Sequence, residues 1–201
     1  MKINESLNLV VPVRSDEKGA ILYAYHTPIS REVFETNYRI LAATKAALSS
    51  KGVHYAMDAG PTIAALALRD EGRKDALERG DVDAKGNPGD GGGDALMNEI
   101  KRLTTILAPS ASGWDHIPVD VAVGRDVIDA DEWKEVEAKL AFFTCHYALA
   151  HKKNREAVVQ ATSSILEGWS TSLSITEWIV SLPTSTNKET TETKAVSSVP
   201  S

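Results

Sequence analysis

The segment from residue 129 to residue 150 constrains the fold more than any other part of the chain. Asp129 and Glu132 have the spacing of a capping box, in which each side chain accepts a hydrogen bond from the other residue's backbone N–H. Large apolar side chains then recur at helical spacing on one face, namely Trp133, Val136, Leu140, Phe143 and Tyr147. We therefore expect a helix from Asp129 to about Ala150 with one face packed on a core.

Two earlier segments also read as helices. Ser30 is a good N-cap residue ahead of the sequence REVFETNYRILAATKAAL, in which Phe34 and Leu41 fall near helical spacing. Pro61 suits the first position of a second helix that reaches about residue 80, and Gly72 is a point at which that helix could break.

The remaining helix signals lie after residue 93. Asp94 would cap a third helix, whose apolar stripe extends to Pro109 and comprises Leu96, Ile100, Leu103 and Leu107. We read residues 110–118 as a turn and Pro118 as the start of a short helical piece. Asn154 would cap another helix with an inward face of Val158, Ala161 and Ile165. Ser174 and Glu177 form a second capping box, which predicts a last short helix ending at Pro183.

The first thirty residues instead predict a β-hairpin. Apolar residues alternate through LNLVVPVR and again through AILYAYH, and the polar stretch SDEKG between them ends in a glycine. Pro12 places the first arm at a sheet edge or marks a bulge. A lone hairpin is marginally stable in water, so it must pack on helices or pair with the edge of another chain.

Together these patterns predict a mainly α fold in one domain with appendages. We expect an N-terminal β-hairpin over residues 1–29, packed on a helical domain over residues 30–182, and a disordered tail over residues 183–201. The tail has no aromatic residue and almost no apolar ones, so it cannot bury enough surface to offset chain entropy. The Gly-rich segment at residues 80–93 lacks large apolar anchors, which predicts a flexible surface loop.

Charge and cysteine content narrow the classes of function. The formal net charge is -6, from 22 Lys and Arg against 28 Asp and Glu, which argues against broad binding of nucleic acid. The densest basic run is His151, Lys152, Lys153 and Arg155, which we interpret as a solvated helix end or turn. Cys145 is the single cysteine and lies in an apolar stretch, so we expect a buried structural thiol. We expect neither a signal peptide nor a membrane-spanning segment.

No pattern of catalytic residues stands out. The Gly-rich segment lacks the Gly-Lys-Ser/Thr of a P-loop and the ligand spacing of an EF-hand, although Asp81, Asp83, Asp90 and Asp94 could hold a cation loosely. His146 and His151 are five residues apart, which differs from the zinc-binding HExxH spacing. An Asp115–His116 contact lacks any accompanying serine motif. We therefore predict no enzyme activity and no catalytic, cofactor-binding or metal site.

Partner binding is the remaining class of function. Aromatic side chains dominate protein interfaces, and Trp169 follows Gly168 among polar residues, so it is the best interface candidate. Trp178 and Phe143 are further candidates for partner binding, although packing alone would also explain them.

Five stretches of the chain resemble the tail assembly chaperones of long-tailed, siphovirus-like bacteriophages. They span most of residues 5–186 and read ESLNLVVPVR, HTPISREVFETNY, LMNEIKRLTTILAP, EVEAKLAFFTCHYALA and SLSITEWIVSLPTST. The resemblance implies a small helical protein of the host cytoplasm that is absent from the mature virion. It implies binding of the tape measure protein and recruitment of the tail tube protein. We expect no nucleic-acid or membrane partner, and a homo-oligomer stays open. Many such genes also make a longer product by ribosomal frameshifting.

Two other readings stay open beside the chaperone. A minor structural virion protein, such as a tail-completion or connector subunit, could use the hairpin edge for strand addition. A cation-dependent enzyme would need a metal site at Asp81, Asp83 and Asp90.

Overall fold

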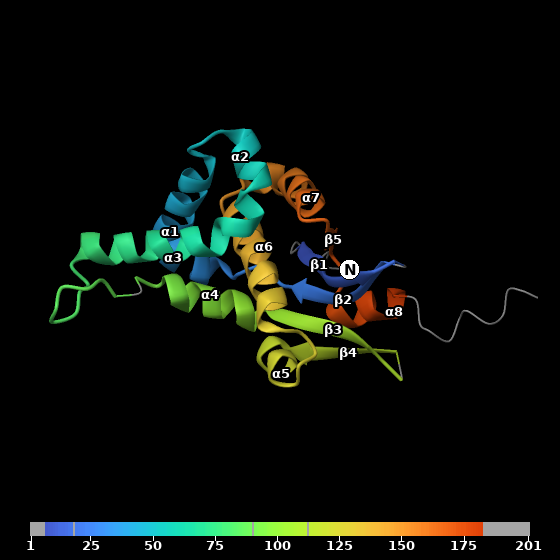
Figure 1. The fold of residues 1–201 in the computed structure, drawn as a ribbon. Helices are drawn as coiled ribbons and strands as arrows, with labels where there is room; N and C mark the ends of the chain where they lie inside the picture. Colours follow the sequence, from blue (N-terminus) through green and yellow to red (C-terminus); the bar gives the residue numbers. More distant parts are fainter. Residues whose placement is uncertain (1–6, 18, 90, 112, 183–201) are drawn as a thin grey trace, which may run out of the picture.

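The computed structural model describes residues 7–17, 19–89, 91–111 and 113–182. Within these residues five antiparallel strands form one sheet in the order β4-β3-β2-β1-β5 (Figure 1). The strands are β1 (Asn8–Asp16), β2 (Gly19–His26), β3 (Thr104–Ser110), β4 (Gly113–Pro118) and β5 (Trp169–Thr171). The prediction of a mainly α fold is therefore wrong, because the chain has an α/β fold in which a five-stranded antiparallel sheet packs with the helices.

Helices connect and cover the strands. They are α1 (Arg31–Ser49), α2 (Val53–Asp58), α3 (Gly60–Arg79), α4 (Gly93–Arg102), α5 (Val119–Gly124), α6 (Ala130–Ala148), the 3₁₀ turn η1 (Lys152–Asn154), α7 (Arg155–Ile165) and α8 (Ile175–Ser181). The side chain of Ser30 accepts a hydrogen bond from the backbone N–H of Val33, which confirms the predicted N-cap of α1. Both predicted capping boxes are confirmed, at Asp129–Glu132 and at Ser174–Glu177.

The predicted hairpin is confirmed as β1 and β2, but it lies inside the sheet. Pro12 lies beyond Asn8–Val10, the part of β1 that pairs with β5. The register of β1 against β2 shifts between Pro12 and Arg14, so the expected bulge is present. Pairing with β3 and β5 supplies the additional strands that a lone hairpin lacks.

The predicted third helix is wrong beyond Arg102. Leu96 and Ile100 are buried in α4 as expected, but Leu103 is the C-cap and Leu107 lies on strand β3. The run Thr104-Thr105-Ile106 is β-branched, which favours a strand, and β3 pairs with β2. The expected turn at residues 110–118 is also wrong, because residues 113–118 form strand β4 alongside β3.

Smaller corrections concern α3 and α7. Helix α3 continues through Gly72 without a break. On α7 the buried positions are Val159, Thr162 and Ser163, whereas Ala161 is exposed, so the predicted inward face is rotated by about one residue. The loop after α3 is exposed from Gly80 to Asn87 and carries a β-bridge between Val82 and Pro88. The tail predicted at residues 183–201 lies outside the described residues.

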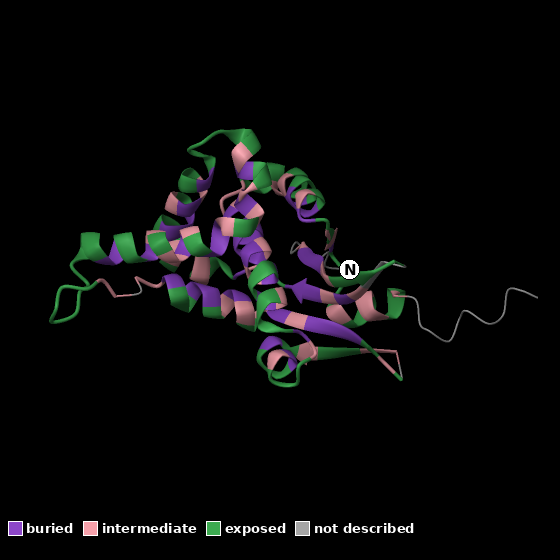
Figure 2. Cartoon of the chain, in the orientation of Figure 1, coloured by how far each residue is buried: buried purple, intermediate pink, exposed green. Residues whose placement is uncertain are grey.

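The main core lies between the sheet and the helices, with α6 at its centre. Leu9 and Val11 of β1 belong to the same buried cluster as Leu140 and Phe143 of α6. On the other side of α6, the ring of Phe142 lies 2.6 Å from where a Cβ on Gly60 would stand, so only glycine fits at the start of α3. Figure 2 shows the buried residues concentrated along α6 and the central strands, while the end of α3 is exposed.

Candidate partner-binding surface

The sheet has two apolar faces, and only one of them faces the main core. Successive side chains on a strand point to opposite faces, so Leu9 and Val11 face α6 while Val10 faces the other way. Val10 forms a separate buried cluster with Tyr25 and Leu107. Helix α8 covers part of this second face (Figure 1), packing Ile175, Trp178, Ile179 and Leu182 against that cluster.

Hydrogen bonds from the sheet hold the start of α8 in place. The hydroxyl of Tyr25 donates to the backbone carbonyl of Leu173 at 2.6 Å, and the Asn8 amide donates to the same oxygen at 3.1 Å. Burial raises the pKa of Tyr25 to about 12, so this phenol stays protonated and remains a donor at neutral pH. The strand face therefore fixes the segment that leads into α8.

Helix α8 itself is only partly buried. Every residue of α8 remains at least partly accessible to solvent. The indole Nε1 of Trp178 is buried, and it has no hydrogen-bond partner among the described residues. A buried donor without a partner costs free energy, so α8 is docked on the sheet less tightly than its apolar contacts alone would imply.

Next to α8 the same face of the sheet carries a row of three aromatic side chains, Trp114, Tyr23 and Trp169, which we call the aromatic row. The rings of Tyr23 and Trp114 are 5.4 Å apart between centroids, and those of Tyr23 and Trp169 are 5.9 Å apart in an edge-on arrangement. Such tilted contacts between aromatic rings are favourable. Trp169 is 46% exposed, so the aromatic row offers apolar surface to a partner.

The structure separates the three residues that the sequence suggested for partner binding. Trp169 lies in the aromatic row opposite Val10, and Trp178 is partly buried on the same face. Phe143 lies on α6 in the main core and is fully buried, so its ring contacts Tyr147 and His26 and presents no surface to a partner. Sequence reasoning missed Tyr23 and Trp114. A strand assignment for GWDHIP would have placed Trp114 on this face.

The titratable groups that could serve catalysis are either buried or point away from each other. Cys145 is buried, and burial raises the pKa of its thiol to about 12, so almost no thiolate forms at neutral pH. Burial lowers the pKa of His26 to about 3, which keeps this imidazole neutral against the hydroxyl of Thr104 at 3.0 Å. Asp115 and His116 are consecutive on β4 and so point to opposite faces.

Two acidic residues in and beside the Gly-rich segment are held by protein groups. Both carboxylate oxygens of Asp83 accept hydrogen bonds from Asn87, and Asp94 forms an ion pair with Arg69 at 3.0 Å. These bonds keep the pKa of Asp83 below its usual range. Asp90 lies outside the described residues. Within the described part of the chain, no group of three or more His, Cys, Asp or Glu side chains is placed to hold a metal ion.

Over the described residues, none of the helices is both long enough and apolar enough to cross a membrane. Comparisons of the chain with protein-family models, with curated proteins and with solved structures found no significant match.

Proposed function

We propose that this protein is a non-enzymatic phage tail assembly chaperone that binds the tape measure protein and assists assembly of the tail tube. The observation that carries the proposal is the aromatic row, three neighbouring rings on a sheet face that α8 covers only in part. The resemblance of five stretches of the sequence to such chaperones supplies the class of partner. On this proposal the protein acts in the host cytoplasm and is absent from the mature virion.

The physical role of the aromatic row is to bind an apolar segment of the client. Tyr and Trp supply large contact areas with few rotatable bonds, so ordering them on binding costs little entropy. Tyr23 and Trp114 already support each other through ring contacts, which preorganises the surface. A long helical client with apolar stripes would gain shelter from aggregation by packing against such a row.

The proposal is tested by co-expression with the tape measure protein encoded beside this gene. Trp169→Ala should lower the amount of soluble client that co-purifies with the chain by fivefold or more. The matched control is Leu66→Ala, which removes an exposed apolar side chain from α3 instead. If the client is equally soluble with and without this protein, the chaperone proposal fails.

A minor structural virion protein is the second candidate, and one observation favours it. Strand β1 pairs with β5 only through Asn8–Val10, so within the described residues no other strand pairs with the outer edge of β1 between Val11 and Ser15. An open edge of this kind accepts an added strand from another subunit. Mass spectrometry of purified virions separates the two candidates, because stoichiometric incorporation would support the structural role and contradict the chaperone role.

A further inference from the structure

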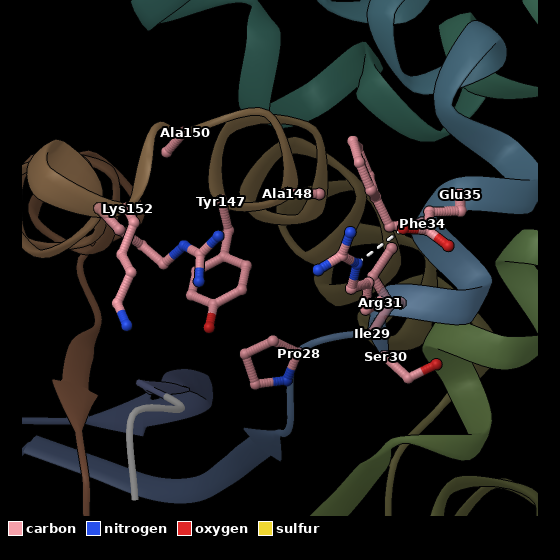
Figure 3. Close-up of a pocket in the computed structure, with 11 residues that line it drawn as sticks. Pro28, Ile29, Ser30, Arg31, Phe34, Glu35, Tyr147, Ala148, Ala150 and Lys152 are labelled. Carbon is pink, nitrogen blue, oxygen red and sulfur yellow. Dashed lines mark hydrogen bonds and ion pairs between the residues drawn. The ribbon is translucent and has the colours of Figure 1, made fainter.

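A pocket of about 730 Å³ lies between the start of α1 and the turn that joins α6 to α7 (Figure 3). It is on a different part of the molecule from the aromatic row. Three cationic side chains line it, Arg31 from α1, Lys152 from η1 and Arg155 from α7. The chain as a whole carries a formal charge of -6, whereas this pocket lining is net positive.

Arg155 is fixed in the pocket by an aromatic ring. Its guanidinium carbon lies 5.0 Å from the centroid of the Tyr147 ring, a cation–π arrangement, and the Tyr147 ring stacks in turn on Phe143 of the core. The Nε of Arg155 is buried. Among the described residues it has no hydrogen-bond partner, and no carboxylate pairs with this side chain. A guanidinium carries five N–H donors in a planar fork, so the other N–H groups of Arg155 can donate to an acceptor in the pocket.

The other charges leave the pocket positive. Glu35 is the one carboxylate among the lining residues, and it already accepts from Arg31 at 2.6 Å. The two residues are one helical turn apart and their side chains are largely solvated, so the ion pair constrains Arg31 only weakly. The pocket lining therefore contains three cations and one carboxylate.

The walls show what kind of anion the pocket fits. Pro28, Ile29, Phe34 and Ala148 line it beside the cations. A volume of about 730 Å³ is far larger than one carboxylate or phosphate needs and lies in the range of pockets that bury drug-sized ligands. Apolar walls beside a charged end suit an acidic side chain together with an apolar neighbour from the same peptide.

We propose that this pocket binds an acidic peptide segment of a protein partner, with a carboxylate of that segment accepting hydrogen bonds from Arg155 and the flanking cations Arg31 and Lys152 assisting. Arginine suits this role because its planar group donates two parallel hydrogen bonds to a carboxylate. A nucleic acid is disfavoured, because it needs a track of cations along its backbone on a net basic face. The site does not depend on the chaperone proposal, since it would exist for any partner with such a segment.

The test is an NMR titration of the full-length, ¹⁵N-labelled chain. The probe is acetyl-Leu-Glu-Leu-Glu-amide, and its neutral match is acetyl-Leu-Gln-Leu-Gln-amide. The acidic peptide should shift amide resonances around residues 28–35 and 147–155 and should bind at least tenfold more tightly than the neutral one. Equal binding of the two peptides, or shifts confined to other regions, would overturn the proposal.

Variants of the lining arginines and binding of other anions test which groups recognise the acidic peptide. Arg155→Gln should weaken binding of the acidic peptide by tenfold or more. Arg31→Gln, at a largely solvated position that should leave folding intact, should weaken it severalfold. Arg73→Gln on α3 is the charge-matched control and should have no effect. Undiminished binding by both the Arg155 and Arg31 variants contradicts the assignment. Inorganic phosphate or a thymidine tetranucleotide binding as tightly as the acidic peptide would also contradict it.

Discussion

Arg14 on β1 and Glu132 in the first turn of α6 form a two-pronged ion pair across 118 positions of sequence. The guanidinium Nε lies 2.6 Å from one carboxylate oxygen and Nη2 lies 2.7 Å from the other. The second oxygen also accepts from the backbone N–H of Asp129, which completes the capping box of α6. The Glu132 carboxylate therefore links strand β1 to the N-terminus of α6.

The first prediction concerns the free energy of this pair. The side chains of Arg14 and Glu132 are 43% and 19% exposed, so solvent screening limits their coupling to about 0.5–1 kcal/mol. Glu132→Ala should cost about 1–2 kcal/mol in total, because it also removes half of a capping box. Urea unfolding of Arg14→Ala, of Glu132→Ala and of the double variant measures the coupling free energy of the pair. The exposed Arg31–Glu35 pair is the control and should show no measurable coupling.

The second prediction is the dependence of stability on pH. The hydrogen bonds and charge of Arg14 lower the pKa of Glu132 below the ordinary value of 4.5. A carboxyl whose pKa is lower in the folded state stabilises the fold above its unfolded pKa, and this contribution is lost as the pH falls through the folded value. Urea unfolding should therefore show decreasing stability below about pH 4.5, with a smaller decrease in Glu132→Gln. An identical decrease in that variant would contradict the assignment to Glu132.

The third prediction concerns Gly91, which lies against the backbone of α3. A Cβ on Gly91 would stand 1.7 Å from the carbonyl oxygen of Gly72, and its φ of +60° also favours glycine. Gly91→Ala should cost about 2–4 kcal/mol, combining overpacking with a strained backbone. Gly86→Ala has a similar positive φ but open space around it, so it should cost only about 1–2 kcal/mol. Thermal unfolding of both variants makes the comparison, and equal losses would show that the contact with Gly72 is unimportant.

The fourth prediction concerns the reactivity of Cys145. Because its thiol is buried with a pKa of about 12, a thiol reagent should label the native chain only as fast as the chain opens. Labelling by iodoacetamide, followed by mass spectrometry, should be at least a hundredfold slower in buffer than in urea. Fast labelling of the folded chain would show that α6 opens locally around this residue.

The sequence predicted those elements whose ends carry a local chemical signal. Ser30, Asp129 and Ser174 cap helices through their own side chains, and those helices begin where expected. Strand β3 was missed because Leu103 and Leu107 continue the helical spacing of α4 by coincidence. Pairing with β2 decides that the chain forms a strand and not a helix after Arg102. This contact joins segments about eighty positions apart in the sequence.

The partner-binding surface was accessible to sequence reasoning only in part. Trp169 was singled out by its polar surroundings, and it is exposed. Phe143 lies on the apolar stripe of α6, and a periodic pattern does not reveal whether such a stripe meets a core or a partner. Trp114 and Tyr23 come together only through the order of strands β4, β3 and β2, which no local pattern encodes.

The place of β5 at the sheet edge has a consequence for synthesis of the chain. Strand β1 is made well before its neighbour β5, although Asn8 pairs with Thr171 in the folded chain. Until then β1 has an unpaired edge on that side, and Val10 lacks the covering of α8. Contacts between segments so far apart form slowly. The growing chain therefore exposes this part of the edge of β1 until residues 169–182 have been made, and pairing with β5 and packing of α8 then cover it.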